Sequence, residues 1–425
     1  MLEIQHLRQH APTAIQGLEH KGVSNAAEQV EQVLQLDEQR RSILTELEQL
    51  RHSSNLISKS IGQLMKAGKK EEAEQAKAQT SEAKQKMKEL EAALQQQQAG
   101  SRSLLLDLPN TPHHTVPIGK TPDDNVIVGE HQVEVSFDFP ALPHWELAKK
   151  HDIIDWDNGS KITGSGFPVY KGKGAMFQRA LITYFLQQAH LAGYTEYHLP
   201  LMINEESGFG TGQLPDKEGQ MYHITKENLF LIPTAEVPLT NLYRDVILQK
   251  EELPVQACGY TPCFRREAGS HGREVKGLNR IHQFDKVEIV QIVHPDHSYE
   301  VLEQMTAHSE SLLKELGLPF RRLLLCTGDM SFTSAKTYDL EVFSAGQDRW
   351  LEVSSISNFE TYQTNRLKLR FRDDKKKTRL AHSLNGSALA LPRIVASLLE
   401  NNQQADGSIL IPEVLQAFTG FDRIG

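Results

Sequence analysis

The chain has 425 residues, of which 39% are hydrophobic and 7% aromatic; this composition indicates a folded protein with more than one domain and excludes disordered and fibrous classes. Its net charge of −9 excludes a protein that coats nucleic acid with general positive charge, so a nucleic acid partner would have to meet local basic patches. The three cysteines have no metal-ligand spacing, which argues against a disulfide framework or a cysteine zinc site and suits a reducing compartment.

The sequence carries no signal for a membrane or for secretion. No apolar run approaches the roughly 20 residues that a helix needs to span a bilayer. Residues 1–10 lack the apolar stretch behind a basic patch that is typical of a secretory signal. We therefore expect a cytoplasmic protein with no membrane partner.

The N-terminal quarter of the chain predicts long helices. After a short helical lead in the first 25 residues, residues 27–99 contain no Pro and only two Gly. Hydrophobic residues recur there at heptad spacing, which is typical of a coiled coil. Arg40 and Ser54 interrupt the first series, and Thr80 stands in phase with the second. The first series is Val33, Leu36, Ile43, Leu47, Leu50, Ile57, Ile61 and Leu64, and the second is Ala73, Ala76, Ala83, Met87, Leu90 and Leu94.

A helix-stop signal separates the two series. Residues 65–70 place Gly68 beside lysines at the end of a long helical pattern. The chain therefore predicts an antiparallel coiled-coil hairpin, an arm with helices of about 55–60 Å at 1.5 Å per residue. The composition changes near residue 105, so we expect one domain over 1–105 and a second over 106–425.

Residues 100–120 contain three prolines and are predicted to form a linker. Beyond it, the pattern predicts mixed helices and strands without βαβ alternation. We therefore expect an α+β fold, an antiparallel sheet flanked by helices. Neither a dinucleotide fingerprint nor a Walker A motif occurs, so bound ATP would need another scheme. The expected helices are 172–192 and 388–402, and the expected strands are 194–201, 228–233, 257–266, 284–292 and 349–355.

The densest polar segment is 264–267, followed by the loop 268–273 and a return strand over 280–288. Alternation along a strand would place Arg265 and Glu267 on one face and Arg266 on the other. An arginine on the face of a sheet can hold a phosphate with two hydrogen bonds. The alternative is a solvated charged hairpin.

Two aromatic and cationic residues complete this prediction. Phe284 on the return strand could stack on a purine, while Arg393 covers the other face of the base. Arg393 ends a run of small residues, 385–393, that leads into a helix, and small residues let a ligand or a backbone approach closely. The alternative is a tight packing corner between strand and helix.

Carboxylates in two short segments suit a cation or an amine. Thr234-Ala235-Glu236 follows an apolar strand. On a regular strand, Glu352 and Ser354 would share a face, with Ser355 opposite unless the strand ends there. Oxygen ligands beside phosphates suit Mg²⁺. Each segment alone is equally typical of ordinary structure.

In order, these segments resemble the three signature motifs of class II aminoacyl-tRNA synthetases. The helix and strand ending at Pro200 resemble motif 1, residues 264–267 motif 2, and residues 386–393 motif 3. Further segments resemble bacterial seryl-tRNA synthetases, and with the arm the similarity covers essentially the whole chain. These segments are 210–215, 234–236, 282–288 and 385–387.

The resemblance implies an enzyme that activates L-serine with ATP and Mg²⁺ and transfers it to tRNA(Ser), and also to tRNA(Sec), as a homodimer. It puts Arg265, Glu267 and Arg393 in catalytic roles and Glu352 with Ser355 on the metal. It implies serine binding by Thr234, Ala235, Glu236, Arg265, Glu288 and Ser387. It implies ATP binding by Arg265, Arg266, Glu267, Ile281, Phe284, Glu352, Val353, Ser354, Ser355 and Arg393.

The resemblance also implies that the arm binds the long variable arm of tRNA through shape and backbone contacts. Lysines near its tip are the candidate contacts: Lys59, Lys66, Lys69 and Lys70. Two other functions stay open. One is a synthetase-like ligase that loads an amino acid onto a carrier protein, although such relatives tend to lack the arm. The other is a non-catalytic coiled-coil RNA-binding protein, which would be expected to lose Arg265, Glu267 or Arg393.

Overall fold

The computed structural model describes residues 1–267 and 276–425. The chain divides into two compact units, Met1–Thr111 and Pro112–Gly425. We describe each unit by itself. No helix in the described ranges has the length and the apolar character that crossing a membrane requires.

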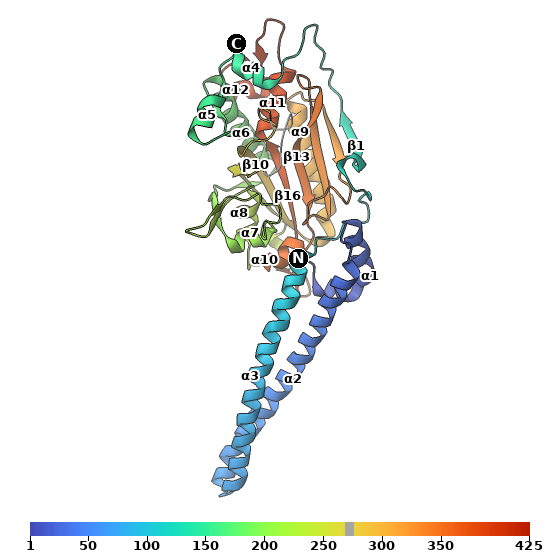
Figure 1. Cartoon of the computed structure of the whole chain (residues 1–425), viewed down its shortest axis with the longest axis vertical. Coiled ribbons are helices and arrows are strands. Elements are labelled where there is room, and N and C mark those ends of the chain that lie inside the picture. Colours follow the sequence, from blue (N-terminus) through green and yellow to red (C-terminus); the bar gives the residue numbers. More distant parts are fainter. Residues whose placement is uncertain (268–275) are drawn as a thin grey trace. The chain divides into compact units, whose positions relative to one another are not determined.

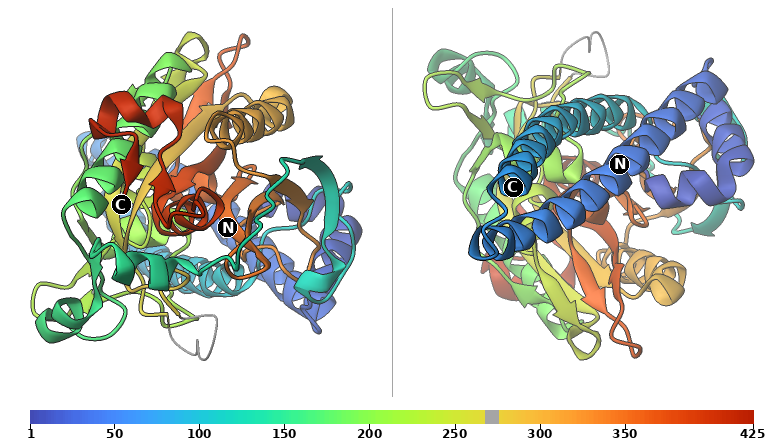
Figure 2. Two further views of the ribbon diagram at one scale, coloured as in Figure 1. Left: turned by 90° about the horizontal axis from the view of Figure 1, so that it is seen from above. Right: turned by 90° about the horizontal axis from the view of Figure 1, so that it is seen from below.

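The first unit is helical and confirms the predicted hairpin. It contains α1 (Ile4–His20), α2 (Ala26–Lys66) and α3 (Lys70–Asp107). Helices α2 and α3 lie side by side and are joined by a short turn (Figures 1 and 2). Gly68 in that turn has φ +77°, and the amide of Lys69 donates to the carbonyl of Leu64 at 3.0 Å. This six-to-one bond around a left-handed glycine is the C-terminal helix stop that the sequence predicts.

The predicted heptad positions face the partner helix. Val33 and Leu47 of α2 are buried, and so are Ala73 and Ala76 of α3. The polar residues that stand in the heptad phase, Ser54 and Thr80, are buried as well, so the seam continues through them. The Thr80 hydroxyl donates to the carbonyl of Ala76 at 2.9 Å, which satisfies it inside its own helix.

The interruption at Arg40 has a specific cause. Arg40 pairs with Asp37 at 2.7 Å, and Asp37 is fully buried. Arg8 of α1 and Arg41 of α2 also reach this carboxylate, at 3.3 Å and 3.2 Å. The Arg8 pair joins α1 to α2, whereas Arg40 and Arg41 compensate the buried carboxylate from its own helix.

Two predicted boundaries are wrong, one in each unit. The linker was expected from residue 100, but α3 continues to Asp107 because Ser101 and Leu105 are buried and the first helix breaker is Pro109. The expected strand 194–201 is reduced to β4 (Thr195–Glu196), since Met202 begins β5 (Met202–Asn204) in a different sheet.

The second unit is built on an eight-stranded sheet, as the predicted α+β class requires. Its strand order is β1-β11-β12-β13-β16-β10-β9-β4, and all pairs are antiparallel except β4 with β9. The long strands form the broad surface in Figure 1. The remaining bounds are β1 (Val126–His131), β9 (Val255–Phe264), β10 (Gln283–Val293), β11 (Phe320–Leu324), β12 (Lys336–Ser344), β13 (Arg349–Asn358) and β16 (His382–Ala390).

Three helices cover one face of this sheet. They are α6 (Lys173–Leu191), α9 (Ser298–Glu315) and α11 (Leu391–Asn401), and their apolar residues join the main core. Val287 and Ile289 of β10 point into that core. Because side chains alternate along a strand, Lys286 and Glu288 belong to the opposite face, which carries the candidate site. Helix α8 (Glu236–Asn241) packs on that opposite face.

The expected helix 172–192 is confirmed as α6, whereas the helix expected from residue 388 begins at Leu391 because residues 388–390 extend β16. The strands expected near residues 228, 257, 284 and 349 are present as β7, β9, β10 and β13, respectively. Shorter elements complete the unit: η1 (Pro122–Asp124), α4 (His144–Lys150), β2 (Ile154–Asp155), α5 (Trp156–Ile162), β3 (Val169–Tyr170), α7 (Glu205–Thr211), β6 (His223–Ile224), β7 (Leu229–Leu231), β8 (Ile247–Gln249), η2 (Lys250–Glu252), η4 (Pro295–His297), α10 (Tyr362–Leu367), β14 (Arg370–Arg372), β15 (Thr378–Leu380), β17 (Ile409–Leu410), α12 (Glu413–Thr419) and β18 (Arg423–Ile424).

Candidate active site

Two buried carboxylates lie at the centre of the candidate site. The Thr234 hydroxyl donates to Oε2 of Glu288 at 3.0 Å, and the same hydroxyl accepts the amide of Glu236 at 3.2 Å, at the start of α8. Lys286 forms an ion pair with Glu288. The segments 234–236 and 282–288, which the sequence analysis singled out separately, thus meet in one place.

Glu236 is held by residues from the neighbouring strand and helix. Its Oε1 accepts from Nε2 of Gln363 at 2.6 Å, and its carboxyl is also hydrogen-bonded to the side chain of Asn385. Gln363 in turn accepts from the Ser383 hydroxyl at 2.8 Å. Burial raises the pKa of Glu236 to about 7, with Glu288 adding to the shift.

The charge balance of this pocket suits an amine. Glu236 and Glu288 share the single cation Lys286 among the described residues that contact them. A bound ammonium group would supply the second positive charge, and it would favour the ionised form of Glu236. Ser387, paired with Glu288 between β10 and β16, lies at the edge of the same pocket.

The Arg265 side chain lies between the pocket and the aromatic residue predicted to stack on a base. Its Nε donates to the carbonyl of Pro233 at 3.3 Å, and its guanidinium carbon lies 5.3 Å from the centre of the Phe284 ring. Glu267 pairs with Arg280 at 2.9 Å. The structure therefore brings Arg265 and Phe284 together.

The prediction that residues 265–267 alternate between the two faces of a strand is wrong. Strand β9 ends at Phe264, and Glu267 has φ +47°, so strict strand alternation does not extend through Glu267. Arg266 is exposed and its amide donates to the carbonyl of Gln220 at 2.9 Å. The loop predicted over 268–273 lies entirely outside the described residues, as do residues 274–275.

Arg393 is fixed near the start of α11 by two backbone carbonyls. Its Nε donates to Asn279 at 3.1 Å and its Nη1 to Glu352 at 2.7 Å. Nη1 also lies 3.5 Å from Oε2 of Glu352. In the same run, a Cβ on Gly386 would stand 3.1 Å from a side-chain carbon of Ile356, so this glycine serves the packing of β16 on β13. The packing alternative thus holds for Gly386, while Arg393 turns toward the site.

A β-bulge overturns the predicted faces of residues 352–355. Strand β13 continues to Asn358, but its pairing with β12 shifts: Leu340 pairs with Ser354, whereas Glu341 pairs with Glu352. Val353 is therefore one extra residue, and it changes the phase of the strand. As a result, Glu352 and Ser355 share a face, and the prediction that Ser355 lies opposite is wrong.

The bulge assembles an oxygen-rich corner. Ser355 pairs with Asp339 across the strands, and their side chains are hydrogen-bonded. Oδ1 of Asp339 is buried without a hydrogen-bond partner. Burial, with Glu352 nearby, raises the pKa of Asp339 well above its usual range. No set of three His, Cys, Asp or Glu side chains in the described residues is arranged to hold a metal by itself.

Three other predicted ATP residues turn away from this face. Val353 and Ile281 are buried in the main core or against it. Ser354 is buried, and its hydroxyl donates to the carbonyl of Ser387 at 2.6 Å. Any contact of Val353 or Ile281 with a ligand would therefore use the backbone.

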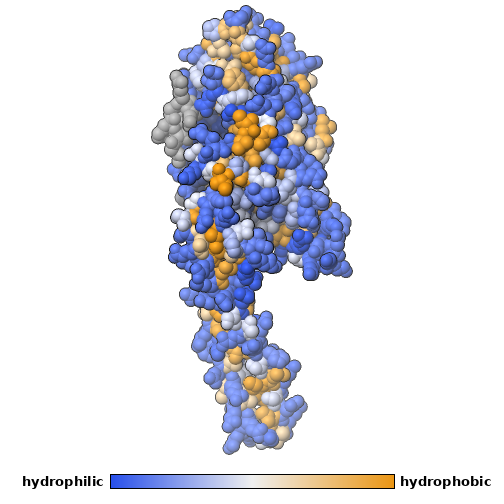
Figure 3. All heavy atoms as spheres, turned by 90° about the vertical axis from the view of Figure 1, so that its right-hand side faces the viewer, coloured by the Kyte–Doolittle hydropathy of each residue, from blue (hydrophilic) through white to orange (hydrophobic). Residues whose placement is uncertain are grey.

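The predicted arm lysines are exposed. Lys59, Lys66 and Lys70 have exposed side chains, and Lys69 pairs with Glu72 at 2.9 Å. The surface of the hairpin is mainly hydrophilic with small hydrophobic groups (Figure 3), among which are Leu56 and Met65.

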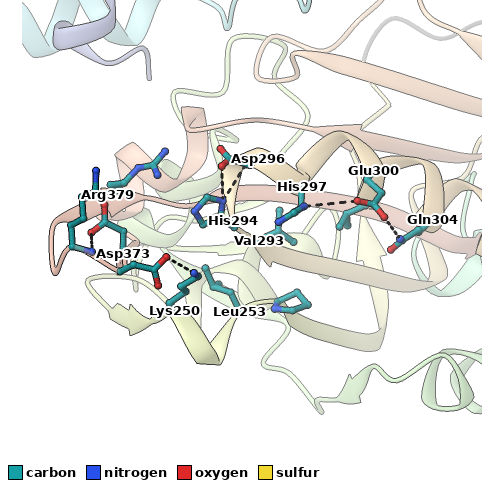
Figure 4. Close-up of a pocket in the computed structure, with 14 residues that line it drawn as sticks. Lys250, Leu253, Val293, His294, Asp296, His297, Glu300, Gln304, Asp373 and Arg379 are labelled. Atoms are coloured by element: carbon teal, nitrogen blue, oxygen red, sulfur yellow. Dashed lines mark hydrogen bonds and ion pairs between the residues drawn. The ribbon is translucent and has the colours of Figure 1, made fainter.

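A separate cavity lies beside η2, η4 and the β14–β15 turn (Figure 4). Its lining includes two ion pairs, Lys250 with Asp374 at 2.5 Å and His294 with Asp296 at 3.7 Å, and also Lys375 and Arg379. None of the candidate site residues lines this cavity, so the cavity is not part of the candidate site.

Comparison with known proteins decides the family. Residues 1–112 match the model described as the seryl-tRNA synthetase N-terminal domain, and residues 222–402 match the class II tRNA synthetase core domain for G, H, P, S and T. A serine–tRNA ligase of Salinibacter ruber is 51% identical over 100% of this chain and 99% of its own length. The chain belongs to the seryl-tRNA synthetase family.

Solved members of the seryl-tRNA synthetase family have the same fold. The enzyme of Pyrococcus horikoshii, solved in complex with ATP, aligns with a TM-score of 0.92 and 33% identity over 100% of this chain and 99% of its own. The cytoplasmic serine–tRNA ligase of Naegleria fowleri, in complex with AMP, aligns with a TM-score of 0.87 and 25% identity over 100% of this chain and 98% of its own.

Sequence reasoning missed several residues of the site. Gln363 lies 127 positions from Glu236 and carries no local pattern that could have found it. Asp339 was hidden in the alternation of β12, although a carboxylate opposite Ser355 becomes visible once the strand pairing is known. Lys286 and Asn385 lay inside segments that the resemblance had already singled out.

Proposed function

We propose that this chain is a serine–tRNA ligase that activates L-serine with ATP to seryl-adenylate and transfers the seryl group to the 3′ end of tRNA(Ser), and also to tRNA(Sec). The observation that carries the proposal is the buried Glu236–Glu288 pocket next to Arg265 and Phe284. It pairs an amine-binding site with an arginine and an aromatic ring suited to a nucleotide.

Serine would bind with its ammonium group against Thr234 and Glu236 and its hydroxyl between Glu288 and Ser387. A pocket that hydrogen-bonds a hydroxyl discriminates strongly against an analogue that lacks it, because buried polar groups are then left unpaired. Arg265 would hold the serine carboxylate and the α-phosphate of ATP together. Ala235, fully buried between these residues, keeps the wall of the pocket tightly packed.

ATP would bind with its adenine against Phe284 and its amino group toward Glu267. Arg393 would lie near the γ-phosphate, with Arg266 and the backbone at Ile281, Val353 and Ser354 completing the contacts. Positioning and charge neutralisation would supply most of the rate enhancement, as in other phosphoryl transfers.

Glu352 and Ser355 fit Mg²⁺. The bulge brings a carboxylate and a hydroxyl to one face, and the unpartnered Oδ1 of Asp339 adds a further hard oxygen donor. When bound, Mg²⁺ would neutralise phosphate charge. The two protein ligands leave room for phosphate oxygens and water, which is how this ion usually binds beside nucleotides.

The reaction would run in two steps. A carboxylate oxygen of serine attacks the α-phosphorus, the bond to the bridging oxygen breaks, and pyrophosphate leaves with both electrons. A terminal ribose hydroxyl of tRNA then attacks the acyl carbon, the bond between that carbon and the phosphate oxygen breaks, and AMP leaves with both electrons while the hydroxyl proton is released. The lysines at the tip of the hairpin, Lys59, Lys66, Lys69 and Lys70, would contact tRNA phosphates.

Residues 1–105 would form the tRNA-binding domain and residues 106–425 the catalytic domain. The protein would act as a homodimer in the cytoplasm.

The test uses purified protein, ATP, Mg²⁺, labelled serine and total bacterial tRNA, with acid-precipitable label as the readout. We expect charging that saturates at the serine-accepting fraction of tRNA and fails with threonine or alanine. Serine-dependent pyrophosphate exchange without charging of tRNA would contradict the tRNA acceptor and favour a carrier protein. Loss of both activities would favour a non-catalytic coiled-coil RNA-binding protein.

A further inference from the structure

A fully buried pair of residues lies beside the candidate site. Nδ1 of His144 is 2.7 Å from Oε1 of Glu400, and neither side chain is exposed. The amide of Leu278 donates to Nε2 of His144 at 2.8 Å. Because Nε2 accepts a hydrogen bond, the ring proton lies on Nδ1 and points at Glu400. The neutral imidazole thus joins α11 to the backbone at residue 278.

A second chain of hydrogen bonds runs from the same carboxylate to the next residue. Nε2 of Gln347 donates to Oε1 of Glu400 at 3.0 Å, and Oε1 of Gln347 accepts from Nδ2 of Asn279 at 2.7 Å. The Ser344 hydroxyl and the amide of Gly346 also donate to Glu400. The buried carboxylate is therefore well satisfied and anchors residues 278 and 279 at once.

The spacing along α11 connects this network to the predicted ATP contact. Arg393 and Glu400 are seven residues apart, which places them on one face of the helix about 10 Å apart along its axis. Nε of Arg393 donates to the carbonyl of Asn279 at 3.1 Å. Residues 278–279 are thus held to one face of α11 at two points.

The packing at this junction permits little movement. Gly277 has φ +66°, and a Cβ at that position would lie 2.2 Å from Nε2 of His144. Nζ of Lys276 lies 4.4 Å from the centre of the Trp145 ring, which adds a cation–π contact just before the junction. A glycine in a left-handed conformation is what allows the backbone to reach the imidazole.

We propose that His144, Glu400 and Gln347 are positioning residues for ATP binding: they hold residues 278–279 so that the Asn279 carbonyl fixes one edge of the Arg393 guanidinium. The other edge, Nη2, has no hydrogen-bond partner among the described residues and would be free to contact a bound nucleotide. This inference rests on the proposed function through the role of Arg393. If the network only stabilised the fold, breaking it would lower the unfolding temperature without changing the affinity for ATP.

The experiment compares Gln347→Ala with Gln403→Ala in the full chain. Gln403 is a matched control, since it is buried beside the end of α11, where its Nε2 donates to Leu142 at 3.0 Å and to the carbonyl of Glu400 at 2.8 Å. Its side chain makes no contact with Asn279 or Arg393 within the described structure. Calorimetric titration with ATP and Mg²⁺ gives the affinity, and a thermal scan gives the stability.

We expect Gln347→Ala to weaken ATP binding by about tenfold, the effect of losing about 1.4 kcal/mol of binding free energy, while Gln403→Ala leaves it within about twofold. His144→Gln retains one donor and one acceptor and should stay near wild type, whereas His144→Leu should weaken ATP binding at least as much as Gln347→Ala.

Equal ATP affinities for Gln347→Ala and Gln403→Ala would overturn the inference. So would affinity losses across the four variants that merely follow their unfolding temperatures. Serine-dependent pyrophosphate exchange by the wild type is measured in parallel. Its absence would reject the proposed function, whereas the ATP affinities would still decide the positioning role.

Discussion

At the scale of single residues, Glu236 links charge, stability and substrate binding. Its pKa of about 7 lies above the ordinary glutamate value because the carboxyl is buried beside Glu288. A folded-state pKa above the unfolded value means that the folded protein binds the extra proton. Folding stability from this group is therefore full below the unfolded pKa and is lost as pH rises through about 7.

Replacing Glu236 by Gln should separate binding from stability. Above pH 7 the ionised carboxyl attracts the serine ammonium, so the wild-type KM for serine should rise as pH falls through that region. Glu236→Gln should raise the KM at pH 8 at least tenfold, remove its pH dependence, and raise the unfolding temperature. Pyrophosphate exchange and thermal scans at pH 6 and pH 8 measure these effects; a steep pH dependence that persists in the variant would contradict the role of this carboxyl.

Replacing Arg265 by Ala should abolish serine activation, by at least about a thousandfold in kcat/KM, because no other described side chain links Pro233 to the face of Phe284. The unfolding temperature should stay close to wild type, since Arg265 is half-buried and not in the core. Arg372→Ala on β14, an exposed arginine in the same unit, is the control for loss of positive charge. Near-normal pyrophosphate exchange by Arg265→Ala would reject the assignment.

The residue types of the site were largely predictable, since Thr234, Glu236, Arg265 and Arg393 stand in recognisable local segments. Their partners were not. Gln363 and Asn279 act through contacts between segments that are distant in sequence, and no periodicity within one segment encodes such pairing.

At the scale of elements, the long helices and the alternation of core strands were predictable from periodicity alone. The bulge at Val353 was not, because Val353 is as hydrophobic as a regular core residue and gives no sign of being extra. The same limitation explains why the strand expected over 194–201 is longer than the observed β4: pairing places β4 and β5 in different sheets, and the local sequence does not show this.

The oxygen-rich corner formed by the bulge predicts how magnesium is used. Glu352→Gln should raise the Mg²⁺ concentration that gives half-maximal pyrophosphate exchange by about tenfold at saturating ATP, since one of two anchoring ligands becomes neutral. Glu300→Gln, at an exposed site on α9, should leave the Mg²⁺ titration unchanged. Identical titration curves for the two variants would exclude Glu352 as a ligand.

The pairing of α1 with α2 depends on Asp37. Asp37→Ala should lower the free energy of opening α1 by about 1–3 kcal/mol, less than for a fully buried pair because its arginine partners are partly in water. Hydrogen exchange of the α1 amides in the full chain measures this opening. Arg41→Ala, which removes the most exposed partner, should change the opening free energy by no more than about 0.5 kcal/mol. Equal effects of the two variants would mean that Asp37 is held by something other than its three cations.

At the scale of the whole molecule, the net charge of −9 makes local basic groups decisive for a polyanionic partner. Charge reversal of Lys59, Lys66 and Lys70 to Glu should weaken charging of tRNA at least tenfold while leaving pyrophosphate exchange intact. The matched control reverses Lys375, Lys376 and Lys377 in the β14–β15 turn, which changes the net charge equally. If both triple variants lose charging to the same extent, total charge rather than the hairpin tip governs the encounter.

The division of the chain into a helical unit and a mixed unit follows from the sequence, because residues 27–99 combine heptad-spaced hydrophobic residues with the absence of Pro. The seam of the hairpin is uneven along its length. Toward the turn, the seam residues of α3 are Ala73, Ala76 and Ala83 with Thr80, whereas toward the base they are Met87, Leu90 and Leu94.

Separating the helices near the turn therefore exposes less apolar surface than separating them near the base. Local unfolding free energy should fall toward the end that carries Lys59, Lys66 and Lys70. A partner that binds this end must restrict chain motions that the free protein retains, and that entropy loss opposes its affinity. The alanines that permit close helix approach thus also set how much of the binding free energy of a partner is spent on ordering the tip.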